Sequence, residues 1–344
     1  MANSDAARAM TDPFLAAART LLCQLGDTIR DRLIAARVAA RGDELAAVAA
    51  ITAADTIYAI DKVGEEAIVE WFSAHWPAAE PVEVVMEGIE DGAELTFPTG
   101  TPVAATKWKV ILDPIDGTRN LMYDKRPAWA LAGLAPQRGP ATNLLDLVVA
   151  AMTELPTSKQ WRADQFSAVR GNGVVAEAVD VIRGGRTPFA PRPSQATDFR
   201  HGWASLSRFF PEGKALTAQI EEALWDQLYG LGRQATPLVF DDQYLCSGGQ
   251  IYELLIGHDR MLGDLRPLVF RKLGMTLPLV CHPYDICNAL ILQEAGGIVE
   301  QPDGSPLAAP LNTTSPVTWM GYANGHLAAR VRPVLQPILT AMLR

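Results

Sequence analysis

Three things are scarce in this sequence of 344 residues: surplus basic charge, paired cysteines and long apolar runs. The formal net charge is -9. No block of Lys and Arg offsets this charge, which argues against a nucleic acid polymer as the main partner, because phosphate backbones are held by clustered basic side chains. The four cysteines form neither a CxxC pair nor an evenly spaced framework, so we expect buried thiols rather than disulfides or structural zinc. They are Cys23, Cys246, Cys281 and Cys287.

No uninterrupted apolar run approaches the roughly 18 residues of a membrane span. The first ten residues lack a charged start followed by an apolar stretch. We therefore expect a cytoplasmic protein without membrane contact. The composition, 49% hydrophobic and 20% charged, is that of an ordinary globular protein, and the length favours one large or two closely joined α/β domains.

The spacing of apolar residues and the turn formers predict a mixture of helices and strands. Helical spacing predicts helices at 13–40, 62–76, 215–229, 247–257 and 284–295. Alternating or β-branched stretches predict strands at 55–61, 82–86, 107–112, 128–135, 145–153, 166–169, 298–300 and 317–323. The Arg-Gly-Asn-Gly sequence at 170–173 predicts a turn.

The stretch 183–198 is rich in Pro, Arg and Thr and is the best candidate for a domain boundary. We predict an N-terminal α+β domain at 1–185, with helices against an antiparallel sheet and the metal-binding loops. The remaining residues, 186–344, are predicted to form a smaller α/β domain that contributes the last metal ligand and the substrate specificity.

The densest chemical signal is the segment 112–120, Leu-Asp-Pro-Ile-Asp-Gly-Thr-Arg-Asn, directly after a predicted strand. It places Asp113 and Asp116 three residues apart around a turn, in which Gly117 permits a tight bend. Such a loop can aim both carboxylates at one point, and Mg²⁺ favours oxygen ligands of this kind. The alternative is a plain Asp-rich turn, since Asp, Pro and Gly are common turn residues.

The Asp-Pro-Ile-Asp-Gly-Thr sequence at 113–118 is similar to a hallmark of the inositol monophosphatase superfamily. A second hallmark of that family is an aromatic-Asp pair at the head of a helix that ends in Glu-Ala-Gly-Gly. Tyr284-Asp285 and the segment 294–297 resemble it, with Tyr284 in place of the more usual Trp. The resemblance spans roughly 50 to 330. It implies a layered α+β or α/β sandwich of the αβαβα type and a magnesium-dependent, lithium-sensitive phosphatase.

Two segments compete for the acid that this family places after an earlier strand. Gly64-Glu65-Glu66 matches the letters but lies inside a predicted amphipathic helix, where exposed Glu is ordinary. Glu87 follows the strand at 82–86, so we assign the role to Glu87. Gly88 stands where the family has a second acid, and Glu90 or Asp91 could compensate. This leaves open whether two or three metal ions bind.

The resemblance implies the metal ligands. One Mg²⁺ would be bound by Glu87, Asp113 and the backbone carbonyl of Ile115. A second would be bound by Asp113, Asp116 and Asp285, so that Asp113 bridges the pair. Two such ions can stabilise the attacking and leaving oxygens of an in-line displacement.

The resemblance also implies how water and phosphate are held. Thr118, polarised by Asp61, would orient the attacking water, although Asp61 could instead cap a helix. Backbone N–H groups of Gly117 and Thr118 would hold the phosphate. Arg119 follows directly and could meet a second phosphate or a charged substrate tail.

Three basic residues precede Asp285, namely Arg266, Arg271 and Lys272. They could also meet a second phosphate or a charged substrate tail, or they could be solvated surface charge. His282 invites a ligand reading, but we prefer a structural role because magnesium favours oxygen over imidazole. The segment 276–283 contains no carboxylate, although inositol monophosphatases carry an inositol-binding acid there.

The substrate is therefore predicted only as a small phosphorylated metabolite, such as an inositol monophosphate-like compound or a sugar phosphate. Histidinol phosphate, a sugar bisphosphate and 3'-phosphoadenosine 5'-phosphate are alternatives, and so is a catalytically silent family member that acts as a binding protein. Homodimers are common in the family, but the residues of this chain give no independent sign of one.

Overall fold

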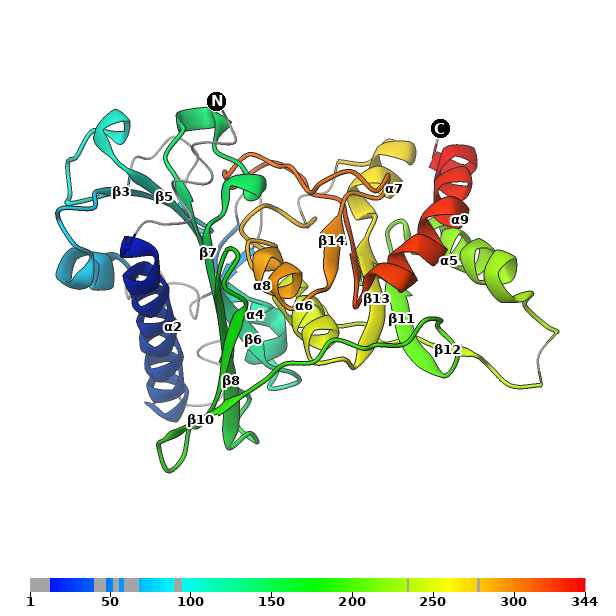
Figure 1. Ribbon diagram of the computed structural model, residues 1–344, viewed down its shortest axis with the longest axis horizontal. Helices are drawn as coiled ribbons and strands as arrows, with labels where there is room; N and C mark the ends of the chain where they lie inside the picture. Colours follow the sequence, from blue (N-terminus) through cyan, green and yellow to red (C-terminus); the bar gives the residue numbers. More distant parts are fainter. Residues whose placement is uncertain are drawn as a thin grey trace.

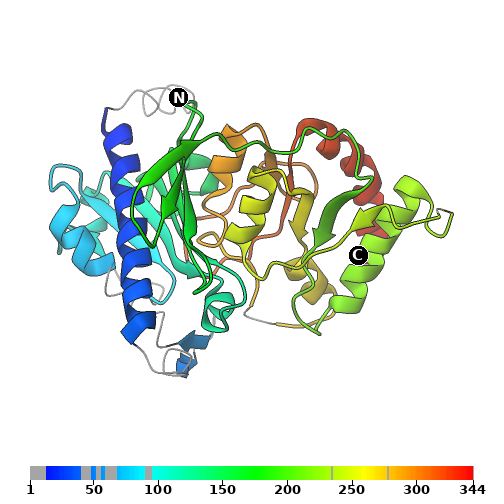
Figure 2. The same ribbon diagram turned by 90° about the horizontal axis from the view of Figure 1, so that it is seen from below.

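Helices and sheets alternate in five layers in this computed structural model (Figures 1 and 2). The structure describes residues 13–39, 48–51, 56–58, 68–89, 95–233, 235–276 and 279–343. Helix α2 (Phe14–Ala39) covers one face of a large sheet, and helices α6 (Ser247–Leu255) and α8 (Ala289–Glu294) lie between that sheet and a smaller one. Helices α5 (Lys214–Tyr229) and α9 (Gly325–Leu343) cover the far face of the smaller sheet. The layered α+β sandwich predicted from the sequence is therefore confirmed.

The larger sheet has eight strands in the order β10-β9-β8-β7-β6-β5-β3-β4. Its strands are β3 (Val82–Met86), β4 (Thr96–Phe97), β5 (Trp108–Asp116), β6 (Ala128–Pro136), β7 (Val149–Leu155), β8 (Arg162–Val169), β9 (Val174–Asp180) and β10 (Arg186–Phe189). Most neighbours run antiparallel, as predicted, but β3 and β5 run parallel. The expectation of a purely antiparallel sheet was wrong at this pair. A small hairpin, β1 (Val48–Ile51) and β2 (Thr56–Tyr58), is separate from the sheet.

The smaller sheet has the order β12-β11-β13-β15-β14. Its strands are β11 (Gly202–Leu206), β12 (Val239–Phe240), β13 (Asp259–Asp264), β14 (Ile298–Glu300) and β15 (Trp319–Tyr322). The remaining helices are α4 (Thr118–Met122), α5 (Lys214–Tyr229), α6 (Ser247–Leu255), α7 (Arg266–Lys272), α8 (Ala289–Glu294) and α9 (Gly325–Leu343). A further helical segment covers 68–75, and short 3₁₀ turns occur at Val103–Ala105, Gly139–Ala141 and Leu144–Asp146.

Three apolar layers hold these elements together. The first lies between α2 and the larger sheet, and includes Leu22, Leu25 and Phe72. The second joins the two sheets through α6 and α8, where Trp129 and Trp319 are fully buried. The third lies beneath α5 and α9. Because the middle layer takes side chains from both sheets, the two halves bury one continuous core between them.

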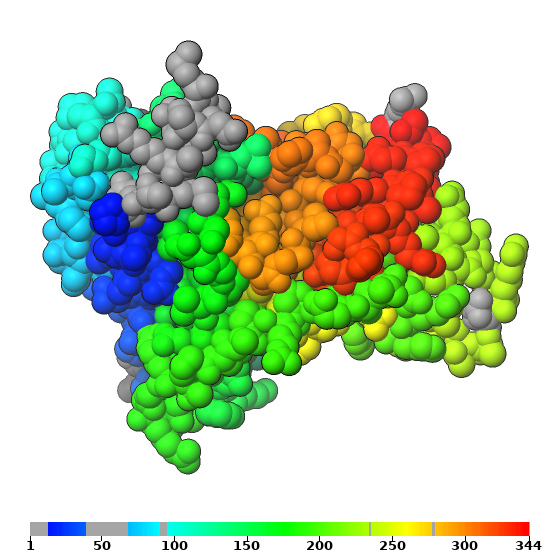
Figure 3. Space-filling model, viewed as in Figure 1, coloured from blue at the N-terminus to red at the C-terminus, as the bar shows by residue number. Residues whose placement is uncertain are grey.

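The C-terminal half also reaches over to the N-terminal sheet. The orange segment that contains α8 and β14 lies on the surface between the green strands and the red helix α9 (Figure 3). Both carboxylate oxygens of Glu294, at the end of α8, accept backbone N–H groups of the 170–173 turn at 2.9 Å. On the other side, β10 lies beyond residue 185 but pairs with β9. The domain boundary stays a prediction.

Three predicted elements need correction. The strand predicted at 145–153 begins only at Val149, after the 3₁₀ turn at Leu144–Asp146. The helix predicted at 284–295 begins only at Ala289, because residues 283–288 form turns that position Asp285. The strand predicted at 107–112 continues to Asp116. Helix α9 was not predicted, since Pro333 and Pro337 lie inside it.

Two expectations from composition can also be compared with the structure. Cys246, Cys281 and Cys287 are buried free thiols, while Cys23 is half-buried. Within the described ranges, no helix combines the length and the apolar character that crossing a membrane requires.

Candidate active site

A bulge in β5 brings the two acids of the 113–118 segment onto one face of the sheet. In a regular strand, residues three apart point to opposite faces. The register between β5 and β6 shifts between Asp113 and Asp116, which inserts an extra residue at this point. The shift turns both carboxylates to the same side, and both are buried. The backbone N–H of Ile115 donates to Asp113 Oδ1 at 2.9 Å and fixes that side chain.

Two further acids reach the same place from other elements. The parallel pairing of β3 with β5 sets Met86 opposite Leu112, so Glu87 leaves its strand beside Asp113. Asp285 comes from the turn before α8, where its Oδ2 accepts the backbone N–H of His282 at 2.5 Å. Ligand oxygens of Asp113, Asp116 and Asp285 all lie within 4.8 Å of one another. We call Glu87 and these three aspartates the acid centre.

The acid centre brings four acidic side chains together. Burial raises the pKa of Asp113 well above its usual range, and the neighbouring carboxylates raise it further. Burial also raises the pKa of Asp116 to about 6, against the effect of several hydrogen-bond donors. Arg266 acts on Asp116 electrostatically, but its ion pair is with Asp264. Buried like charges that are held together in this way are typical of a functional site.

The start of α6 holds Asp116 from the opposite half of the molecule. The backbone N–H of Gly248 donates to Asp116 Oδ2, and the Cys246 thiol lies 3.1 Å from the Asp116 carbonyl oxygen. A Cβ on Gly248 would lie 2.8 Å from Asp116 Oδ2, so this close approach needs glycine. Apolar spacing predicted the helix at 247–257, but this contact was not predicted. The Cys-Ser-Gly-Gly sequence at 246–249 was the available signal.

The loop after Asp116 is fixed by local contacts. Gly117 has a φ of 93°, and a Cβ there would lie 3.0 Å from Cys246 Sγ. The Thr118 hydroxyl donates to the carbonyl oxygen of Ile115 at 2.9 Å. These contacts hold Thr118 and Arg119, the first residues of α4, beside the acids.

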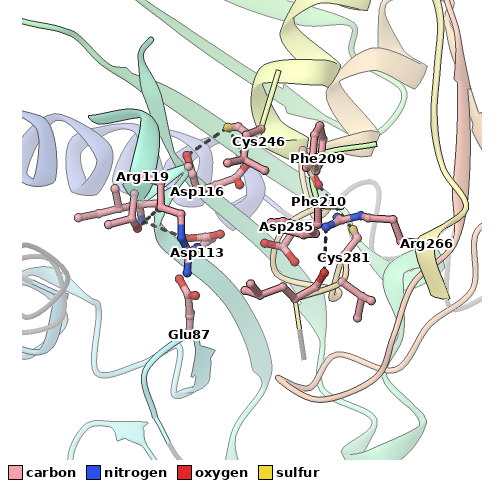
Figure 4. Close-up of a pocket in the computed structure, with 17 residues that line it drawn as sticks. Glu87, Asp113, Asp116, Arg119, Phe209, Phe210, Cys246, Arg266, Cys281 and Asp285 are labelled. Atoms are coloured by element: carbon pink, nitrogen blue, oxygen red, sulfur yellow. Dashed lines mark hydrogen bonds between the residues drawn. The ribbon is translucent and has the colours of Figure 1, made fainter. Parts of the chain in front are cut away.

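The structure brings nearly all the predicted site residues to one pocket (Figure 4). Those that line it are Glu87, Asp113, Ile115, Asp116, Gly117, Thr118, Arg119 and Asp285. Asp61, predicted to pair with Thr118, lies outside the described residues, as do the competing Glu65 and Glu66 and the possible substitutes Glu90 and Asp91.

The other predicted residues divide into buried and exposed ones. Arg266 is buried and lines the pocket, which contradicts its reading as surface charge, whereas Arg271 and Lys272 are exposed. His282 is buried, stacks on Tyr284 with 5.3 Å between the ring centroids, and lies outside the pocket lining.

The donor set fits a hard divalent cation. It offers carboxylate oxygens, and Ile115, whose carbonyl oxygen accepts the Thr118 hydroxyl, lines the same pocket. Cys246 and Cys281 also line the pocket, but burial raises the pKa values of their thiols well above the usual range, which disfavours the thiolate form. Oxygen-rich sites without thiolate or imidazole suit Mg²⁺ or Mn²⁺ better than Zn²⁺.

Comparison with known proteins gives matches in structure but not in sequence. No family model matches the chain, and neither does any curated protein. The chain is similar to the extragenic suppressor protein suhB from Bartonella henselae, with 15% identity and a TM-score of 0.62 over 93% of this chain and 98% of that one. It is also similar to fructose-1,6-bisphosphatase from Leishmania major, with 14% identity and a TM-score of 0.65 over 93% of each chain.

A third similar structure is a hypothetical protein from Pyrococcus horikoshii described as having similarities to inositol-1 monophosphatase. It matches with 14% identity and a TM-score of 0.59, over 93% of this chain and 98% of that one. At such identities the likeness shows the fold. The resemblance to the inositol monophosphatase superfamily, inferred from two short motifs, is therefore confirmed for the architecture.

Proposed function

We propose that this protein is a magnesium-dependent phosphomonoesterase that hydrolyses a small phosphorylated metabolite to an alcohol and inorganic phosphate. The observation that carries the proposal is the convergence of Asp113, Asp116 and Asp285, whose ligand oxygens lie within 4.8 Å of one another at one pocket, with Asp113 and Asp116 buried. A protein gains nothing in stability from packing like charges together, so the arrangement makes sense when a cation joins it.

The acids would hold two ions. A third position would lack one of its ligands, because Gly88 stands where the family has a second acid. Glu87, Asp113 and the Ile115 carbonyl would bind one, and Asp113, Asp116 and Asp285 the other. Bound Mg²⁺ would supply a Lewis acid for phosphoryl oxygens and a lowered pKa for an attacking water. The N–H groups at the start of α6 favour the ionised form of Asp116, because they donate to it and so oppose the rise in pKa that burial causes.

The loop after the acids would receive the phosphate and the water. Gly117 and Thr118 would contact phosphate oxygens through their N–H groups, and the Arg119 side chain would add a charged donor. The Thr118 hydroxyl, paired with Asp61, would orient the attacking water. Phosphoryl transfer depends mainly on this kind of positioning and charge stabilisation.

The fold and the family resemblance also support proposals about the location of the protein, the roles of its two parts and its oligomeric state. We propose a cytoplasmic protein in which residues 1–185 supply most metal ligands, and residues 186–344 supply Asp285 and the walls that select the substrate. A homodimer accords with the family resemblance and is testable by sedimentation.

Phosphate release from a panel of monoesters, measured with and without Mg²⁺, tests the proposal. We expect hydrolysis with Mg²⁺, none with chelator, and loss of turnover by at least about a thousandfold in Asp113→Asn, since several kcal/mol of charge stabilisation disappear. Glu222→Gln makes the same acid-to-amide change on the exposed face of α5 and serves as the control.

Near-normal turnover by Asp113→Asn would reject the assignment. Binding of Mg²⁺ without hydrolysis of any ester would favour the silent binding protein instead. A thermal melt separates these outcomes from misfolding, because metal-free Asp113→Asn loses a buried like charge and should be at least as stable as the parent.

A further inference from the structure

The pocket has two chemically different halves (Figure 4). On one side stand Glu87, Asp113, Asp116 and Arg119, which belong to the larger sheet and the loops that follow its strands. On the other side stand residues from the smaller sheet and its connections. Figure 4 places Phe209, Phe210, Arg266, Cys281 and Asp285 there. Leu279, whose carbonyl oxygen accepts Arg266 Nη1, and Val280 also line the pocket. If the phosphate sits at the acids, the alcohol part of the ester faces this second half.

Two consecutive phenylalanines dominate the second half. Phe209 and Phe210 follow β11, and their ring centroids lie 6.2 Å apart at an interplanar angle of 83°. Both side chains are only partly buried, and so are Leu279 and Val280. Apolar side chains that remain accessible inside a concave site are the usual means by which a pocket binds the non-polar part of a ligand.

Arg266 contacts Phe209, Phe210 and Leu279 and braces this apolar wall of the pocket, while its own charge is paired with Asp264. Its Nε and Nη2 donate to the Asp264 carboxylate at 2.9 and 2.5 Å, and its Nη1 donates to the Leu279 carbonyl at 2.9 Å. The guanidinium lies 4.8 Å from the Phe209 ring centroid and 5.5 Å from that of Phe210. Because Asp264 already neutralises it, Arg266 is poorly placed to neutralise a second phosphate on the substrate.

A polyol would be a poor occupant of the apolar surface that Phe209, Phe210, Leu279 and Val280 form in this half. Each hydroxyl that is buried without a hydrogen-bond partner costs about 1–3 kcal/mol. The described part of the 279–281 segment offers a leucine, a valine and a buried thiol instead of a carboxylate. Phenylalanine rings, by contrast, favour edge-to-face or offset contact with another aromatic ring.

We propose that the alcohol part of the substrate carries an aromatic ring, which packs against Phe209 and Phe210 while the phosphate lies at the acid centre. This inference rests on the proposed phosphatase function and names its substrate class. The ring could belong to a simple aryl alcohol or to a nucleoside, and both present the same planar apolar face.

The test uses phosphate esters of alcohols rather than of phenols, so that differences in leaving-group reactivity do not decide the result. The value of kcat/KM is measured with Mg²⁺ for benzyl phosphate, cyclohexylmethyl phosphate, inositol 1-phosphate and adenosine 5'-monophosphate. We expect benzyl phosphate to exceed inositol 1-phosphate by roughly tenfold or more, and to exceed cyclohexylmethyl phosphate as well. The adenosine ester tells whether a nucleoside or a simple aryl group is preferred.

Variants then locate the preference. Phe209→Ala or Phe210→Ala should reduce the ratio of benzyl to inositol ester by about tenfold, mainly through KM. Phe209→Leu keeps the apolar volume without the ring and should give an intermediate ratio, so it serves if the alanine variant fails to fold. Phe240→Ala removes an exposed phenylalanine on β12 that does not line the pocket, and should leave the ratio unchanged.

Two results would overturn the inference while the phosphatase proposal stands. One is Mg²⁺- and Asp113-dependent hydrolysis that favours inositol 1-phosphate. The other is equal use of cyclohexylmethyl and benzyl esters. If no ester is hydrolysed at all, both proposals fall.

Discussion

Two groups of buried acids in this molecule have opposite surroundings. One is the acid centre. The other, which we call the Glu154 cluster, consists of Glu154, Gln160, Arg162 and Asp164 at the ends of β7 and β8. Glu154 and Asp164 are 5% and 4% exposed, as deeply buried as the aspartates of β5. Burial alone therefore does not distinguish the two groups.

Their hydrogen bonds and ion pairs do distinguish them. In the Glu154 cluster, Glu154 accepts the Gln160 side-chain amide and the backbone N–H of Asp164, each at 2.7 Å. Arg162 binds both oxygens of Asp164, at 2.6 and 3.1 Å. In the acid centre, carboxylates face carboxylates across a pocket. Neighbouring donors and a cation therefore offset the charges of the Glu154 cluster, whereas the acid centre gathers several carboxylates at one point, which is typical of a cation site.

The largest expected effect comes from Asp285→Asn, which keeps the shape of a side chain in the acid centre but removes its charge. The amide oxygen can still accept the N–H of His282, so the turn should persist. We expect phosphate release with Mg²⁺ to fall by about a thousandfold. Turnover within tenfold of the parent would place Asp285 outside the chemistry, and Glu222→Gln is the matched control.

In the Glu154 cluster, Glu154→Gln should change the pH dependence of stability. Burial raises the pKa of Glu154 from 4.5 to about 7, so the folded protein holds a proton that the unfolded chain releases. The stabilisation is complete below about pH 4.5, declines as pH rises, and is lost above about pH 7. It amounts to about 3 kcal/mol.

Urea titrations from pH 5 to 8 measure this difference. The parent should lose more stability than Glu154→Gln over this range. Asp259, whose pKa burial also raises to about 7, contributes the same trend to both proteins and cancels in the comparison. Parallel pH profiles for the two proteins would contradict the prediction.

Adding Mg²⁺ should stabilise the protein through the acid centre alone. A ligand at 100 times its Kd adds about 2.7 kcal/mol to the free energy of unfolding. We expect this gain in the parent and in Glu154→Gln, and its loss in Asp113→Asn. Chemical denaturation with and without Mg²⁺ measures it. An equal gain in all three proteins would mean that the ion binds elsewhere.

Arg162→Met gives the smallest expected effect and tests whether the Glu154 cluster is architectural. Removing one partner leaves buried Asp164 without its cation, at a cost of about 2 kcal/mol, reduced because Arg162 is 44% exposed. The same change at Arg32, whose partner Glu70 is 66% exposed, should cost less than about 0.5 kcal/mol. Equal melting temperatures for the two variants would contradict a structural role for the Glu154 cluster.

Local sequence was sufficient wherever a short pattern carries its own geometry. The helix at Phe14–Ala39 and the strands at Val82–Met86 and Ile298–Glu300 follow from apolar spacing, because one face of each element must be buried. Apolar spacing did not predict α9, because two prolines inside it lower its helix propensity. Apolar packing nevertheless stabilises this helix. Apolar spacing also gave a wrong prediction at 284–288, where the chain forms turns and Asp285 accepts the backbone N–H of His282.

By itself, the local sequence determined that Asp113 and Asp116 can point to one place, because a loop with Pro and Gly after a strand permits it. The layered architecture and the joining of Glu87 and Asp285 to this pair were implied by the resemblance of two short motifs to a known family. Only the tertiary structure decided what completes the pocket. The N–H groups of α6 on Asp116, and the wall of Phe209 and Phe210 braced by Arg266, come from the distant half of the chain. Contacts between segments so far apart depend on how the two sheets pack, and no local pattern of residues encodes that packing.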